Sequence, residues 1–192
     1  MQRNRLEAFS DGVIAIIITI MVLELKVPHE VGIDALAPLT PILLCYVLSF
    51  VYVGIYWNNH HHMLHTARIV TGPILWANLH LLFWLSLIPF ATAWMGETYF
   101  AAVPSAAYGV VLLCAAVAYY ILQQQIIATQ GDDSILKQAV GRDWKGKLSP
   151  FLYFFAIVST VFSAWIAVAI YALAALIWLI PDRRIERVLT EE

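Results

Sequence analysis

Long apolar stretches constrain the fold of this chain more than any other feature of its sequence. Clear examples cover about residues 6–25, 38–59, 72–95 and 103–128. A helix needs about 20 mostly apolar residues to cross the hydrocarbon core of a bilayer. In that core every backbone polar group must be satisfied within the protein, and a helix does this by itself. We therefore predict an all-α integral membrane protein that crosses the bilayer several times.

Composition excludes a soluble domain. Charged residues make up only 12% of the 192 residues and hydrophobic residues 61%, whereas a soluble domain carries about 25% charged residues. No linker rich in Gly, Ser or Pro divides the chain, so we expect residues 1–192 to form a single transmembrane domain. The net charge is −2 and no basic stripe is present, so we expect no nucleic-acid partner.

The last apolar block, about residues 148–181, is ambiguous in length. As one helix it would be about 50 Å long, which is too long for a hydrocarbon core of about 30 Å unless the helix is strongly tilted. It is also short for two full spans. Polar and small residues at 159–165 are the natural place for a tight turn between two short helices. The block therefore predicts either one span or two.

The positions of the basic residues decide between these alternatives. With six spans and a cytoplasmic N-terminus, only Lys26 of the 11 basic residues falls outside the cell. The cytoplasmic group is Arg3, Arg5, Arg68, Lys137, Arg142, Lys145, Lys147, Arg183, Arg184 and Arg187. With five spans, the three C-terminal arginines would cross to the outside. Because short cytoplasmic segments are enriched in Lys and Arg, we predict six spans in the plasma membrane, with both termini cytoplasmic.

The first apolar helix has two different faces. At about 100° per residue, bulky aliphatic side chains form one stripe, and Ser10, Asp11 and Ile18 point away from it. The stripe and its flank consist of Arg5, Phe9, Gly12, Ile16, Thr19, Ile20 and Leu23. From the pattern alone, this stripe faces lipid or ordinary helix packing.

Asp11 needs a separate explanation because it lies about 9 Å deeper in the membrane than Arg5. An ionisable side chain at that depth is costly and normally faces protein or a water-filled cavity. It either coordinates ions or hydrogen-bonds a neighbouring helix. Since Asp11 points away from the aliphatic stripe, we favour the hydrogen-bonding role.

The segment Arg5-Leu6-Glu7-Ala8-Phe9-Ser10-Asp11 resembles a known family signature. It matches the RxxxFSD motif of the prokaryotic relatives of the lysosomal potassium channel, transmembrane protein 175. The resemblance extends along the whole chain, through Trp57, His60, His61, Asn78, Leu79, Pro89, Phe90 and residues 178–184. The short motif gains specificity from these later blocks and from its position on the first helix.

This resemblance implies a homotetramer of six-helix subunits, each of which lines a central pore with its first helix. In the family the tightest hydrophobic ring falls at the position of Ile16, with further rings at Ile20 and Leu23. The threonine implicated in selectivity corresponds to Thr19. The sequence has no TVGYG motif, so a filter of stacked carbonyl groups is not available. We therefore expect a cation channel that conducts potassium ions with modest selectivity over sodium. We expect no cofactor.

An apolar neck at Ile16 would gate by dewetting or by small rotations of the helix. Four Thr19 hydroxyl groups would replace part of the hydration shell of an ion. Glu24 either concentrates cations at the outer mouth or is an interfacial charge balanced by Lys26. The glycine at position 12 departs from the family pattern, in which an apolar side chain is usual.

The resemblance also implies a polar network that braces Arg5, Phe9, Ser10 and Asp11. Either His60 or His61 joins this network, and the sequence does not choose between them. Asn78 is a further candidate member, because a buried amide in a membrane helix must find hydrogen-bond partners.

Four histidines, His60, His61, His62 and His65, cluster at the cytoplasmic end of the second helix. No Cys, Asp or Glu lies close to them in the sequence, so we expect interfacial histidines and no metal site. A proton-coupled transporter that uses Asp11 and a histidine is the alternative function. It would require paired broken helices, which the sequence does not show. No nucleophile and base stand out at membrane depth, so we do not expect an enzyme.

Overall fold

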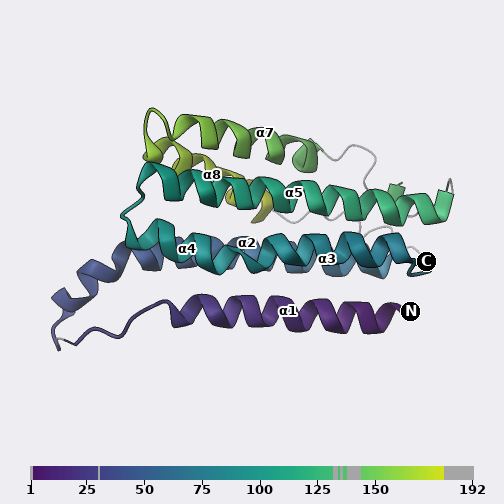
Figure 1. Cartoon of the computed structure of the whole chain (residues 1–192), viewed down its shortest axis with the longest axis horizontal. Helices are drawn as coiled ribbons and strands as arrows, with labels where there is room; N and C mark the ends of the chain where they lie inside the picture. The colour runs from purple at the N-terminus through teal and green to yellow at the C-terminus, as the bar shows by residue number, and fades with distance from the viewer. Residues whose placement is uncertain (1, 30, 132–133, 135, 138–143, 180–192) are drawn as a thin grey trace.

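The computed structural model describes residues 2–29, 31–131, 134, 136–137 and 144–179, and its regular elements are all helical (Figure 1). The first helices are α1 (Arg3–Leu23), the 3₁₀ helix η1 (Ile33–Leu39) and α2 (Thr40–His65). They are followed by α3 (Gly72–Ser86), α4 (Ile88–Glu97) and α5 (Ala102–Gln130). The last two are α7 (Trp144–Ser159) and α8 (Ala164–Leu179).

Prolines mark the starts of three of these helices. Pro41, Pro73 and Pro89 lie in the first turns of α2, α3 and α4, where a missing backbone N–H costs no intrahelical bond. The predicted third span, 72–95, is therefore interrupted at Leu87, between α3 and α4. The chain nevertheless continues in one direction, and Gly72–Glu97 is long and apolar enough to cross a bilayer.

The ambiguous last block consists of two helices. Helix α7 ends at Ser159 and α8 begins at Ala164, so the turn lies where the sequence predicted it. Backbone N–H groups of Phe162 and Ser163 donate to the Ser159 carbonyl and close this turn, at 3.0 and 2.9 Å. With α3 and α4 taken together, the described residues form six helical rods. Four of the stretches are long and apolar enough to span a membrane.

The rods lie side by side, with α1 at one edge of the molecule and α7 at the other (Figure 1). Helix α1 packs on α2, α3 and α4, whereas α5 lies between α3 and α4 on one side and α7 and α8 on the other. Because α1 is an edge helix, the rest of the chain covers only one of its faces.

Tyrosines fill the middle of the bundle. Tyr52, Tyr108 and Tyr171 are fully buried, and the hydroxyl groups of Tyr52 and Tyr171 donate to backbone carbonyls at 2.7 and 3.0 Å. Tyr171 lies against Gly109 of α5, where its hydroxyl group occupies the position that a Cβ atom would need. The core therefore combines large aromatic side chains with satisfied polar groups, as burial in a bilayer requires.

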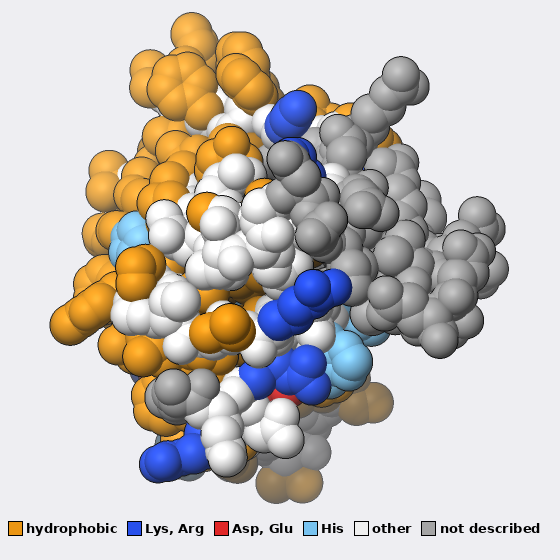
Figure 2. All heavy atoms as spheres, turned by 90° about the vertical axis from the view of Figure 1, so that its right-hand side faces the viewer, with side chains coloured by type: hydrophobic (Ala, Val, Ile, Leu, Met, Phe, Trp, Pro, Cys, Tyr) orange, Lys and Arg blue, Asp and Glu red, His pale blue; other side chains and the backbone are white. Residues whose placement is uncertain are grey.

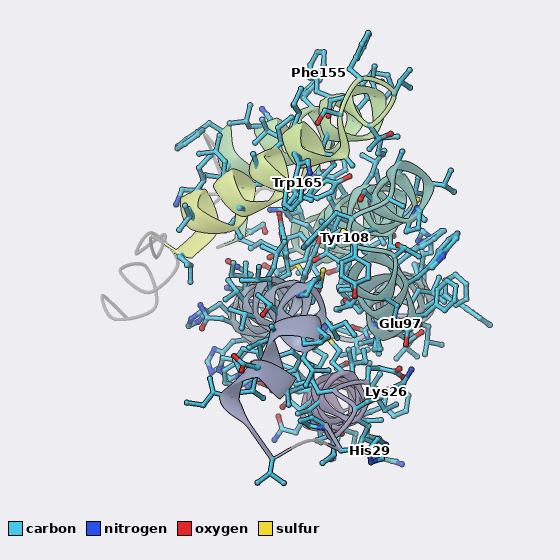
Figure 3. The ribbon with its side chains drawn as sticks, turned by 90° about the vertical axis from the view of Figure 1, so that its left-hand side faces the viewer. Lys26, His29, Glu97, Tyr108, Phe155 and Trp165 are labelled. Atoms are coloured by element: carbon cyan, nitrogen blue, oxygen red, sulfur yellow. The ribbon has the colours of Figure 1, made fainter. Side chains whose placement is uncertain are left out.

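The basic side chains separate between the two ends of the bundle. Figure 2 shows Lys and Arg gathered on the end face where α1 begins and α2 ends. There the Arg3 guanidinium donates to the His65 carbonyl at 2.9 Å. Lys26 lies at the other end and forms an ion pair with Glu97 at 2.7 Å (Figure 3). Four of the arginines in the predicted cytoplasmic group, Arg142, Arg183, Arg184 and Arg187, lie outside the described residues.

Candidate pore helix and its polar anchor

The aliphatic stripe of α1 is exposed on the surface of the subunit. Ile16 is 58% exposed, Ile20 42% and Leu23 78%. On the opposite face Ile14 and Ile17 are buried against α2, α3 and α4. The aliphatic stripe expected from the helical wheel is therefore the part of α1 that the rest of the chain leaves uncovered.

Thr19 lies on the same exposed face, one turn beyond Ile16. Its hydroxyl group donates to the Ile16 carbonyl of the same helix at 2.9 Å. The proton of this hydroxyl is thus used within α1, and the oxygen keeps its lone pairs as acceptors. An oxygen in this state is suited to a cation.

A chain of hydrogen bonds attaches the buried face of α1 to α3 and α2. The Asn78 amide donates to the Ser10 hydroxyl at 3.0 Å, and the Asn78 carbonyl oxygen lies 2.7 Å from His60 Nε2. Ser10 itself donates to the Leu6 carbonyl at 2.9 Å. Ser10, His60 and Asn78 are all completely buried. Of the two histidines that the sequence left open, His60 is the one bonded to Asn78.

The direction of this chain determines the tautomer of His60. The Asn78 side chain directs its N–H group to Ser10 and its oxygen to His60. Because an amide oxygen only accepts hydrogen bonds, His60 Nε2 carries the proton and donates. His60 Nδ1 is then unprotonated, and it has no hydrogen-bond partner among the described residues. In this series of hydrogen bonds, from His60 through Asn78 to Ser10, every donor therefore points toward α1.

A second, more exposed set of contacts joins the same helices nearer the surface. The Trp57 indole donates to Asp11 at 3.0 Å, and His61 Nδ1 lies 2.7 Å from Glu7. The Trp57 and His61 rings are stacked, with centroids 6.4 Å apart. These contacts link α1 to α2 on the side of α1 that faces away from Ile16.

Not every predicted network residue takes part in these bonds. Phe9 is 50% exposed and Arg5 is also exposed, so both project away from the subunit beside the aliphatic stripe. Asp11 is bonded to Trp57 and not to a histidine.

Sequence reasoning missed two partners. No partner was predicted from the sequence for Trp57, whose indole N–H donates to Asp11. None was predicted for Glu7 either, which is bonded to His61. The chemistry of these side chains could have predicted the contacts, because an indole N–H and two carboxylates near membrane depth all need partners.

A groove of about 620 Å³ runs beside the exposed stripe, between α1 and α4. Ile16 and Ile20 line one wall, and Phe90 and Trp94 of α4 line the other. Glu24 and Glu97 also line it, toward the end where α1 stops. The hydrogen bond and ion pair with Glu97 raise the pKa of Lys26 above its usual value. Lys26 therefore neutralises the charge of Glu97 more directly than it neutralises that of Glu24.

The rings of the histidine cluster lie close to one another without stacking face to face. His61 lies edge-on to His62 and tilted against His65, with centroid distances of 5.5 and 6.2 Å. Among the residues that the structure describes, no group of three His, Cys, Asp or Glu side chains is arranged to hold a metal ion.

Known proteins are similar to this chain in sequence and in fold. A family model described as the endosomal/lysosomal potassium channel TMEM175 matches residues 5–89, which include the Arg5–Asp11 segment, His60 and Asn78. A potassium channel of Chryseobacterium sp. (strain P1-3) is 55% identical over 191 residues, and the match covers 100% of both chains. A potassium channel of Streptomyces collinus (strain DSM 40733 / Tue 365) is 34% identical over 67% of this chain and 66% of that relative.

The fold is similar to that of a solved channel. The crystal structure of a lysosomal potassium-selective channel TMEM175 homolog from Chamaesiphon minutus superposes with a TM-score of 0.80 and 29% sequence identity. The superposition covers 94% of this chain and 97% of that chain.

Proposed function

The chain belongs to the TMEM175 family of potassium channels, and from this premise we propose that four copies of it form a potassium-selective pore around their α1 helices. The observation that carries this proposal is the exposed face of α1. A row of aliphatic side chains lies uncovered on a helix whose other face is held by a buried polar network. In a central pore surrounded by four such helices, the aliphatic face of each helix lines the pore and the polar face attaches the helix to the rest of its subunit.

Ile16 forms the neck of this pore. It lies about 16 Å along α1 from Arg5, and therefore near the middle of a bilayer whose core is about 30 Å thick. Four Ile16 side chains that converge there exclude water when the pore narrows, and the neck gates by dewetting. Ile20 and Leu23 continue the same apolar lining toward the outer mouth.

Thr19 supplies the oxygen atoms beside this neck. Its hydroxyl oxygen has lone pairs available because the proton is donated to the Ile16 carbonyl. Four such oxygens replace only part of the hydration shell of a cation, so selectivity for potassium over sodium is modest compared with that of a carbonyl filter. Glu24 lines the groove near the outer end of α1 and attracts cations there.

The groove between α1 and α4 provides a place for a neighbouring subunit. Its walls are mainly apolar, and it lies directly beside the exposed stripe. A second copy that packs against the α4 wall of this groove would cover Phe90 and Trp94, while the Ile16 wall stays turned toward the axis. The assembled protein is a multi-pass channel of the plasma membrane, with both termini in the cytoplasm. The grouping of Lys and Arg at the end where α1 begins supports this orientation.

The alternative of a proton-coupled transporter receives less support. Such a carrier would pass protons between Asp11 and a histidine. Asp11 is bonded to the Trp57 indole, which is a donor only and cannot accept a proton from Asp11, and His61 is bonded to Glu7. Single-channel recording separates the two functions, since only a channel gives unitary current steps.

Two isoleucine substitutions test the pore assignment. We expect Ile16→Asn to raise the conductance of channels reconstituted in planar bilayers, because four amides in the neck remove the dewetting barrier. The matched control is Ile18→Asn, which places the same amide on the half-buried side of α1 and leaves permeation largely unchanged. The reversal potential between potassium and sodium solutions is measured for both. Unchanged current in Ile16→Asn, combined with altered current in Ile18→Asn, would refute the rotation of α1 and the pore with it.

A further inference from the structure

A second cavity lies far from α1, between α2, α5, α7 and α8. Its volume is about 490 Å³, within the range of about 300–1,000 Å³ that ligand sites occupy. Its lining comes from the C-terminal halves of α2 and α5, the N-terminal half of α7 and the last residues of α8. These parts of the helices lie toward the end of the bundle where the basic side chains gather (Figures 1 and 2). The proposed pore uses none of its residues.

Two buried polar side chains, Gln123 and Tyr56, line this cavity. Gln123 is 4% exposed and Tyr56 is 9% exposed, and both line the cavity. Both side chains bring a polar end group to a lining that is otherwise largely apolar. A few polar groups in a mainly apolar cavity fix the orientation of a ligand, so this cavity is suited to a molecule that has polar atoms as well as apolar surface.

The rest of the lining separates into an apolar body and a basic rim. Ile55, Ala116 and Ile127 belong to the body, together with the faces of the tyrosine rings. Lys137 and Lys147 belong to the rim, and Lys147 is exposed. A site of this kind matches a molecule with an acidic head and a hydrocarbon tail.

Fixed contacts hold the rim in place. The Trp178 indole donates to Ser149 at 2.7 Å, and Lys145 lies over the Trp178 ring at 6.0 Å from its centroid. These contacts fasten the end of α8 to the start of α7, so this wall of the cavity is formed before any ligand enters. Tyr120 and Gln124 also line the cavity, and both are exposed.

We propose that this cavity binds an acidic phospholipid of the cytoplasmic leaflet. The phosphate lies at the rim, beside Lys137 and Lys147. The glycerol and ester oxygens accept hydrogen bonds from the Gln123 amide and the Tyr56 hydroxyl, and an acyl chain lies against the apolar body. Basic pockets between transmembrane helices at the cytoplasmic side bind acidic headgroups in this way.

The test is lipid binding by the delipidated full-length channel, measured by native mass spectrometry. Phosphatidylglycerol is compared with phosphatidylcholine of the same acyl chains, and with inorganic phosphate alone. We expect phosphatidylglycerol to bind several-fold more tightly than phosphatidylcholine. Lys147→Gln should weaken the binding of phosphatidylglycerol about five-fold, the effect of one basic side chain at a membrane surface. Arg68→Gln is the matched control, because Arg68 is exposed at the same end and does not line the cavity.

A second variant tests the body of the cavity separately from its charge. Ala116 is half-buried in the lining, so Ala116→Phe fills the space for the acyl chain without removing a polar group. It should lower the occupancy of both lipids. The proposal would be overturned by equal affinity for the two lipids, or by an equal loss of phosphatidylglycerol affinity in Lys147→Gln and Arg68→Gln. Unchanged lipid binding in Ala116→Phe would also overturn it. Binding of inorganic phosphate as tight as that of the lipid would also overturn it, since it would assign the rim to a free anion. Because binding is measured and not current, this result is independent of the pore assignment.

Discussion

Replacement of Asn78 by leucine is the most direct test of what holds α1 in place. Asn78 makes both of its bonds to buried groups on other helices, with Ser10 on α1 and His60 on α2. Leucine has nearly the same size, so packing changes little and the measured effect reports the lost hydrogen bonds. The substitution also leaves His60 with both ring nitrogens unpartnered among the described residues, since Nδ1 has no partner already.

The expected loss follows from these contacts. Hydrogen bonds between membrane helices contribute about 0.6 kcal/mol each on average, so the two bonds contribute about 1 kcal/mol. A buried polar group left without a partner adds about 1–3 kcal/mol. We therefore expect Asn78→Leu to lower the free energy of unfolding by about 2–4 kcal/mol. The measurement is reversible unfolding in mixed micelles, followed by tryptophan fluorescence.

Asn59→Leu is the matched control. The Asn59 amide donates only to the Ile55 carbonyl of its own helix, at 2.8 Å, and it is partly buried. Its loss should cost less than about 1 kcal/mol, because no second helix is released. A double-mutant cycle with Ser10→Ala adds a second criterion, since bonded partners give non-additive effects. Equal destabilisation by Asn78→Leu and Asn59→Leu, with additive effects of Asn78→Leu and Ser10→Ala, would refute the claim that this chain anchors α1.

Two further predictions follow from other contacts. Asp11→Ala removes the acceptor of the Trp57 indole, so it should reduce the yield of tetramer in mass measurements, whereas an intact tetramer with altered conductance would assign Asp11 to permeation. Gly109→Ala should lower the melting temperature, because its Cβ would collide with Tyr171 and such overpacking costs about 1–3 kcal/mol. Gly12→Ala, at a position with open space around it, should leave the melting temperature nearly unchanged, and an equal loss in both variants would exclude the collision as the cause.

The sequence predicted most of the fold because the bilayer imposes simple requirements on length and polarity. The starts and ends of α1 and α5 lie within a few residues of the predicted spans, and the turn after Ser159 lies where small and polar residues interrupt the last block. The second helix continues to His65, six residues beyond the predicted end, because its final turns are polar and hydropathy does not detect them. The break at Leu87 was missed because α3 and α4 are equally apolar on both sides of it.

The candidate site was predictable to a lesser degree. The helical wheel separated the exposed and buried faces of α1, because the spacing of side chains around a helix is fixed by geometry. It did not choose between His60 and His61, since two consecutive residues lie only about 100° apart and both can approach a neighbouring helix. The cavity between α2, α5, α7 and α8 was not foreseen, because its lining comes from four segments that are distant in the sequence.

The polar anchor explains how the rotation of α1 is determined at all. Ile16, Ile17 and Ile18 are consecutive isoleucines, so burial of apolar surface alone favours no particular rotation of this helix. Ser10 removes the ambiguity, because its bond from Asn78 fixes one face of α1 against α3. Ile16 follows Ser10 by six residues and therefore points about 120° away from it. A single buried polar contact can specify the register of a helix in this way even when it contributes little stability. For this reason the Ser-Asp part of the signature lies less than two turns from the proposed neck, on a different face of the same helix.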